Sequence, residues 1–173
     1  MLYRFWPIAL AALGLAGCAT FTPKIAGQTD IVAWEATDLS LERRGPQNLW
    51  VYSFELLIGE TRGVAVTFKE IETTIYQPGT MPWSGRFNGS WTLEARDQFR
   101  IPLYSSLGCG VSFDGCDGPN VPIPLWRIVM QGTDERGQAV KAVIDLSLPA
   151  APPAVPVKTS RSVREITLVP AKR

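Results

Sequence analysis

The side chains that most often do acid–base and nucleophilic chemistry are scarce in this 173-residue chain. It contains no histidine, which excludes Ser-His-Asp and Cys-His catalysis and any histidine-ligated metal. A carboxylate pair could still hydrolyse a glycoside, and the candidates are Glu55, Glu60, Glu70 and Glu72. On the predicted strands, however, outward Glu residues at alternate positions are typical of a solvated face. We therefore expect no enzymatic activity and no catalytic residues.

One acidic, glycine-rich segment lies at residues 114–120. Its Asp114, Asp117 and Asn120 offer oxygen atoms on flexible turns, and oxygen is the ligand that Ca²⁺ prefers. Three side chains fall short of the roughly six to eight oxygens that Ca²⁺ takes, and the terminal Glu of an EF-hand is missing. Asp and Asn also stabilise turns by bonding to their own backbone. We expect no metal, and these three residues are the candidates if one binds.

The first 17 residues have the three parts of a secretory signal. Arg4 supplies the positive charge, residues 8–15 form an uninterrupted run of apolar residues and Gly, and Ala16 and Gly17 are the small residues that a peptidase needs. The apolar stretch is shorter than the roughly 20 residues of a transmembrane helix. We therefore expect residues 1–17 to be a cleaved signal peptide.

Cys18 follows this signal directly. Leu15-Ala16-Gly17-Cys18 resembles the lipobox of bacterial lipoproteins. The resemblance implies diacylglycerol on the Cys18 thiol, cleavage before Cys18 and an N-acyl chain such as palmitate, with no other cofactor. More than one chain is needed because a single acyl chain binds a membrane only marginally. Ala19, at a position where Asp would be a retention signal, implies sorting to the outer membrane, facing the periplasm. The alternative is an ordinary signal and a free Cys18.

Cys109 and Cys116 remain once Cys18 is acylated. An even pair in an oxidising compartment suggests a disulfide that closes a small loop. In the loop-entropy model such a loop contributes about 2–3 kcal/mol. The alternative is a redox pair, which usually has only two residues between its cysteines. We predict a structural disulfide between Cys109 and Cys116.

Trp83 lies in residues 78–87, a segment rich in turn-forming residues, with Arg86 and Phe87 close by. We expect this segment to be a loop. An exposed aromatic beside an arginine is a candidate hot spot for protein contacts or a platform on which a sugar stacks. The alternative is an aromatic side chain folded back over one end of the core.

The remaining sequence is typical of short strands separated by turns. Large apolar residues alternate with smaller or polar ones over residues 49–58, a period of two. Within residues 63–76 the apolar positions change from even to odd near Lys69-Glu70, which predicts a bulge or bend. Further strands are expected at residues 31–36, 90–95, 98–104, 125–131 and 138–148, the last two as a hairpin, with a long irregular loop over residues 105–124. Leu39 and Leu41 would extend the first of these strands or start the next.

Seven or eight such strands indicate an all-β, antiparallel β-sandwich. Their spacing, with runs such as Phe99-Arg100-Ile101-Pro102-Leu103, resembles an immunoglobulin or fibronectin type III domain. It is also loosely similar to the domain of water-stress and late-embryogenesis-abundant proteins. The domain would span residues 31–148. Residues 18–30 would be a lipidated tether, residues 149–157 a proline-rich linker, and residues 158–173 a basic tail or an added strand.

These observations predict a membrane-anchored cell-envelope lipoprotein that acts as a non-enzymatic protein-interaction or assembly module. Its expected partners are the membrane, through the lipid, and a protein of the envelope. The alternative is a binder of a small envelope ligand, such as a glycan, a lipid or a metal ion. Export and a net charge of only +1 argue against nucleic acid as a partner.

Overall fold

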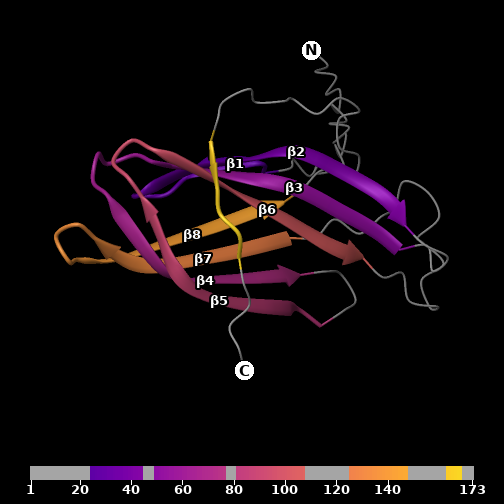
Figure 1. The fold of residues 1–173 in the computed structure, drawn as a ribbon. Helices are drawn as coiled ribbons and strands as arrows, with labels where there is room; N and C mark the ends of the chain where they lie inside the picture. The colour runs from indigo at the N-terminus through magenta and orange to yellow at the C-terminus, as the bar shows by residue number, and fades with distance from the viewer. Residues whose placement is uncertain (1–23, 45–48, 77–80, 108–124, 148–162, 169–173) are drawn as a thin grey trace, which may run out of the picture.

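A computed structural model describes residues 24–44, 49–76, 81–107, 125–147 and 163–168 of the chain (Figure 1). These residues are all-β, without helix, and form nine strands in two sheets. The strands are β1 (Ala26–Gln28), β2 (Val32–Arg44), β3 (Leu49–Glu60), β4 (Val66–Tyr76), β5 (Trp83–Leu93), β6 (Gln98–Leu107), β7 (Leu125–Asp134), β8 (Ala139–Ser147) and β9 (Arg164–Glu165).

The two sheets form a β-sandwich. One sheet has the order β1-β2-β3-β6-β9 and the other has the order β5-β4-β7-β8. All neighbouring strands are antiparallel except β6 and β9, which are parallel. The chain changes sheet between β3 and β4 and returns between β5 and β6, so the sheets are interleaved in sequence (Figure 1). The predicted sandwich and the β7–β8 hairpin are therefore confirmed.

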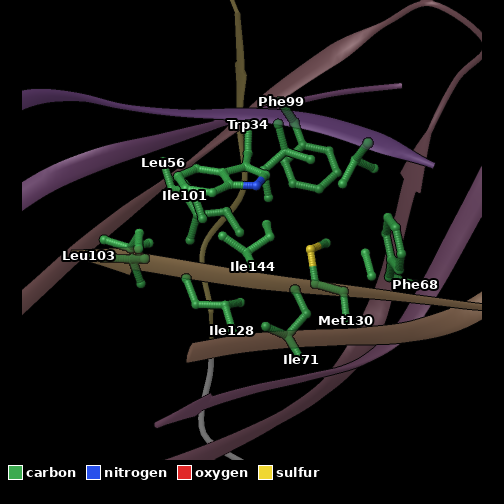
Figure 2. Close-up of a cluster of buried hydrophobic side chains, with 14 of the residues drawn as sticks. Trp34, Leu56, Phe68, Ile71, Phe99, Ile101, Leu103, Ile128, Met130 and Ile144 are labelled. Carbon is green, nitrogen blue, oxygen red and sulfur yellow. The ribbon is translucent and has the colours of Figure 1, made fainter. Parts of the chain in front are cut away.

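The core lies between the sheets and follows the alternation of the sequence. In β3, Tyr52, Phe54, Leu56 and Ile58 are buried, and the residues between them are partly exposed. Figure 2 shows side chains from both sheets meeting in one cluster. The Phe54 and Trp126 rings meet edge to face with centroids 5.1 Å apart, an arrangement that adds to the free energy of area burial.

The phase change near Lys69-Glu70 is a bulge. The register of β4 shifts between Phe68 and Glu70 against both of its neighbours. Val66 and Phe68 are buried before the shift, and Ile71 is buried after it. The backbones approach so closely here that a Cβ on Gly132 of β7 would lie 2.0 Å from the Thr67 carbonyl oxygen. Gly132 is therefore required by close packing, as is typical beside bulges.

Two of the predicted strands are considerably longer in the structure. Leu39 and Leu41 extend the strand expected at residues 31–36, which continues to Arg44 through a register shift between Thr37 and Ser40, where Asp38 has a φ of 50°. The strand expected at residues 90–95 begins at Trp83, so the predicted loop around Trp83 was wrong. Its Gly- and Ser-rich sequence has low strand propensity, which pairing with β4 overrides.

The two short strands β1 and β9 come from the ends of the described chain. Ala26–Gln28, which fall in the expected tether, pair with β2. Arg164–Glu165, in the expected tail or added strand, pair with β6, and the Ile166 N–H donates to the Arg100 carbonyl at 3.0 Å. Ile166 is only 8% exposed, so this segment contributes to the core.

Candidate functional site

Most of the predicted site residues lie outside the described residues. These are Cys18, the pair Cys109 and Cys116, and the metal candidates Asp114, Asp117 and Asn120. Trp83, Arg86 and Phe87 are described, and all three lie on β5, a terminal strand of the four-stranded sheet. The candidate site is therefore the β5 edge surface, which we define as Met81, Trp83, Arg86, Phe87 and Trp91.

The apolar members of the β5 edge surface share one face of the strand. Trp83, Phe87 and Trp91 pair with inward-facing residues of β4, so they point toward the sandwich interior. Phe87 and Trp91 pack partly against the core. Trp83 is nevertheless 57% exposed, and Met81 just before it is 93% exposed. These apolar side chains therefore run from the core, at Trp91, to solvent, at Met81.

Two glycines of β5 leave room for the tryptophan rings on this face. A Cβ on Gly85 would lie 2.7 Å from Cη2 of Trp83 and 3.3 Å from Cε2 of Phe87. A Cβ on Gly89 would lie 2.6 Å from Cζ2 of Trp91. Each tryptophan ring therefore lies along its own strand, over a glycine that leaves room for it. The contact between each glycine and its tryptophan ring is evident only from these distances and not from the sequence.

Arg86 points the opposite way. It pairs with Glu72 on the outer face of the sheet, and its guanidinium lies 3.9 Å from Glu70 and 3.8 Å from Glu72. Both distances are at the outer limit of an ion pair, and the Arg86 side chain is 59% exposed. Trp83 and Arg86 are thus separated by the thickness of the strand. A ligand stacked on Trp83 would not reach the guanidinium on the same face.

Among the four carboxylates weighed for catalysis, three face outward in ion pairs. Glu55 lies 3.2 Å from Arg100, and Glu70 and Glu72 share Arg86. In the described part of the chain, no group of three or more Cys, Asp or Glu residues is placed to hold a metal ion. The described chain also contains no helix long and apolar enough to cross a bilayer.

The fourth carboxylate, Glu60, has a structural role instead of the catalytic one considered for it from the sequence. It is only 7% exposed and accepts hydrogen bonds from the backbone N–H groups of Arg62, Gly63 and Arg96. Burial raises the pKa of Glu60, but backbone donors at Arg96, Arg62, Gly63 and Val64 outweigh that effect and hold the pKa below its usual value. Arg96 has a φ of 60°, and its N–H is fixed by this carboxylate.

Glu60 therefore joins the loop after β3 to the turn between β5 and β6. Because Arg96 follows β5 closely, the carboxylate holds the C-terminal end of that strand. The opposite end, at Met81 and Trp83, lacks such an anchor among the described residues. A signal was present in the sequence, since Glu60 ends an inward-facing series in β3 and is followed by Gly63.

No family model and no curated protein matches the sequence. Among solved structures, a Northeast Structural Genomics Consortium target designated SoR45 superimposes with a TM-score of 0.55 at 11% identity, covering 71% of this chain and 89% of the other. A Bordetella pertussis protein to which the name ApaA has been given superimposes with a TM-score of 0.51 at 17% identity, covering 74% of this chain and 98% of the other. At these identities the likeness concerns the fold alone.

Proposed function

We propose that this protein is a membrane-anchored cell-envelope lipoprotein whose β-sandwich is a non-enzymatic interaction module. Its docking site is the β5 edge surface. The observation that carries the proposal is the 57% exposure of Trp83 on a terminal strand, beside the 93% exposed Met81. The lipobox-like Leu15-Ala16-Gly17-Cys18 supports the anchor, and the pair Cys109 and Cys116 supports a structural disulfide in an oxidising compartment.

The strand order supports an immunoglobulin or fibronectin type III type of sandwich. In that family two hairpin strands and a later strand form one sheet, and the strands between and after them form the other. Here β2, β3 and β6 correspond to the first set, and β5, β4, β7 and β8 to the second. The strands β1 and β9 are then additions at the two edges of the five-stranded sheet. Domains of this architecture commonly serve as binding modules on cell surfaces.

The chemistry of the β5 edge surface favours a protein as the ligand. Trp and Phe offer a large contact area at low entropic cost, Met adds a flexible apolar side chain, and Arg and Trp are enriched at the centres of protein interfaces. An edge strand also presents unpaired backbone groups to which an extended partner strand can bond. Phe87 and Trp91 are already packed against the core, so the surface is held in place before binding.

A photo-crosslinking residue in place of Ser84 tests this proposal in intact cells. Ser84 is exposed on β5, next to Trp83. We expect one dominant crosslinked protein, which is lost with Trp83→Ser. Tyr104→Ser is the matched control, because Tyr104 is 77% exposed on β6 of the other sheet. A spread of weak products, or equal effects of the two substitutions, would contradict the proposed site.

The anchor has its own test. Cys18→Ser should abolish labelling with a palmitate analogue and move the protein from the membrane fraction to the soluble fraction. Unchanged labelling would contradict the lipoprotein assignment. Because the crosslinking experiment depends only on β5, the two parts of the proposal succeed or fail separately.

A further inference from the structure

The sequence of β5 reads almost the same in both directions about Phe87. Residues 83–91 are WSGRFNGSW, in which the Trp, Ser and Gly pairs at equal distances from Phe87 are identical. The Arg86 and Asn88 pair is the exception. In antiparallel pairing of two identical strands about a two-fold axis, residue i faces the residue at the same distance on the other side of the axis. A palindromic strand therefore presents matched side chains to a second copy of itself.

The fold places this palindrome where a second copy can reach it. β5 has a strand neighbour, β4, on one side only within the described residues. It is 11 residues long and contains neither Lys nor Pro, the residues that commonly protect sheet edges. At its far end the Arg164 guanidinium donates to the Thr92 carbonyl, beyond the palindrome. From Trp83 to Ser90 most side chains are exposed.

We propose that the partner at the β5 edge surface is a second copy of this chain, joined by antiparallel β5–β5 pairing centred on Phe87. This inference rests on the proposed function, because it names the chain that docks at the same surface. The pairing is isologous, as two-fold symmetric dimers require. It joins two four-stranded sheets into one continuous eight-stranded sheet and removes the open edge from both copies.

The side chains of the two copies then match by type. On the inner face, Trp83 lies opposite Trp91 of the partner subunit, and the two Phe87 rings meet at the axis. Gly85 lies opposite Gly89 of the partner subunit, which leaves space for the rings that lie along each strand. The exposed ring of Trp83 thereby gains an aromatic neighbour. Aromatic cross-strand pairs are among the most favourable pairs in sheets.

The register of β5 against β4 fixes where this pairing is regular. β5 follows β4 residue by residue from Trp83 to Asn88, and the shift falls between Asn88 and Trp91. The three central pairs of the dimer use residues 86–88 and lie within the regular stretch. The outer pairs extend over the bulge, which increases the twist of the joined sheet.

Arg86 and Asn88, the one pair of the palindrome that is not identical, allow a specific test of the proposed dimer. On the outer face, Arg86 lies opposite Asn88 of the partner subunit, twice in each dimer. Asn88→Lys places like charges opposite each other at both positions and should raise the dissociation constant of the dimer about tenfold. Asn88→Asp creates two opposite-charge pairs and should lower it by about the same factor. Native mass spectrometry of the purified full chain over a dilution series measures both.

The effects of these substitutions on the folding of a single copy do not follow their effects on the dimer. Within one copy, Asn88 pairs with Glu70 of β4. Asn88→Lys therefore adds an attraction to Glu70 and a repulsion from Arg86, two residues away on the same face, and Asn88→Asp reverses both signs, so the opposing effects within the monomer offset each other. A weaker Asn88→Lys dimer together with an unchanged or higher unfolding midpoint supports the proposal, because a merely misfolded variant cannot give that combination.

The outcomes separate this inference from the proposed function. A chain that is monomeric at all concentrations, or a dimer that both substitutions change in the same direction, overturns self-pairing. If the photo-crosslinking residue at position 84 traps one dominant but different protein, the proposed docking function stands and self-pairing is wrong. If that residue traps this chain itself and the charge series behaves as stated, both stand.

Discussion

The terminal strands of the two sheets differ in their length and in how far other segments cover their edges. β1 and β9 are only three and two residues long, and β8 is bridged by Lys24, whose backbone exchanges hydrogen bonds with Ser147. β5, in contrast, is 11 residues long and exposes Trp83. Natural sheets protect their edges with short strands, charges and covering segments. Among the described residues, three edges of this sandwich are protected in that way and one is open, which supports β5 as the docking edge.

The same difference is visible in the environment of the tryptophans. Trp126 and Trp34, on strands β7 and β2, are 1% and 4% exposed, and Lys24 Nζ lies 5.7 Å from the Trp34 ring centroid. Trp83 lies on the corresponding inward face of its strand and remains 57% exposed. Inward direction alone therefore does not bury a side chain. The rest of the sandwich must also cover it, as it covers Leu93 on the same strand and the inward residues of the other terminal strand of this sheet, β8.

A substitution at the closed edge beside β9 is expected to have the largest effect on stability. Ile166→Ala should lower the free energy of unfolding by about 3 kcal/mol, because it removes a buried side chain and leaves a cavity. Urea denaturation followed by tryptophan fluorescence measures the loss. Thr167→Ala, at the exposed neighbouring position, should change it by less than about 0.5 kcal/mol. Equal losses would mean that Ile166 does not close this edge.

Substitution of Glu60, which holds the C-terminal end of β5, is expected to have an intermediate and pH-dependent effect on the free energy of unfolding. Glu60→Gln replaces one carboxylate oxygen with a donor and should cost about 2 kcal/mol at neutral pH. Because folding lowers the pKa of Glu60, its contribution is present above the ordinary carboxyl pKa and is lost as the pH falls through the folded-state value.

The difference between the wild type and Glu60→Gln should therefore shrink in acid. Denaturation at neutral pH and at a series of acidic values measures this difference. The Asp145 carboxyl, whose hydrogen bond from Arg127 lowers its pKa, titrates in both proteins, so its effect cancels in the comparison. A difference that stays constant with pH would show that the charge of Glu60 is unimportant.

The smallest expected effects on the free energy of unfolding come from substituting two serines, one at a closed edge and one at the open edge. Ser147 accepts a hydrogen bond from the Lys24 N–H at 2.8 Å and is 5% exposed, so Ser147→Ala should cost about 1 kcal/mol. Ser84→Ala removes a hydroxyl that pairs with Thr74 in solvent and should cost less than about 0.5 kcal/mol. Thermal denaturation resolves the two. A loss at Ser84 as large as at Ser147 would contradict the energetic difference between the edges.

Much of the candidate site could not be predicted from sequence because its position depends on non-local pairing. Their residue types identify Trp83, Arg86 and Phe87 as a group, but the predicted loop is wrong and the structure divides them between two faces of β5. The Gly85 and Ser84 positions disfavour a strand locally. Their strand conformation comes from pairing with Thr73 and Thr74, which are about ten residues earlier.

Features that depend on neighbouring residues are predictable from the sequence. The alternation in β3, the phase change at Lys69-Glu70 and the β7–β8 hairpin were all predictable, because side chains alternate along a strand and an added residue reverses them.

Three features depend instead on contacts between distant segments. These are which strand ends each sheet, the packing of Ile166 into the core beside β6, and the Glu60 carboxylate that holds the end of β5. These features join segments that are far apart in sequence: Ile166 bonds to Arg100, and Glu60 bonds to Arg96. A local pattern is the same at an edge and at the centre of a sheet, and the difference arises only when the strands assemble.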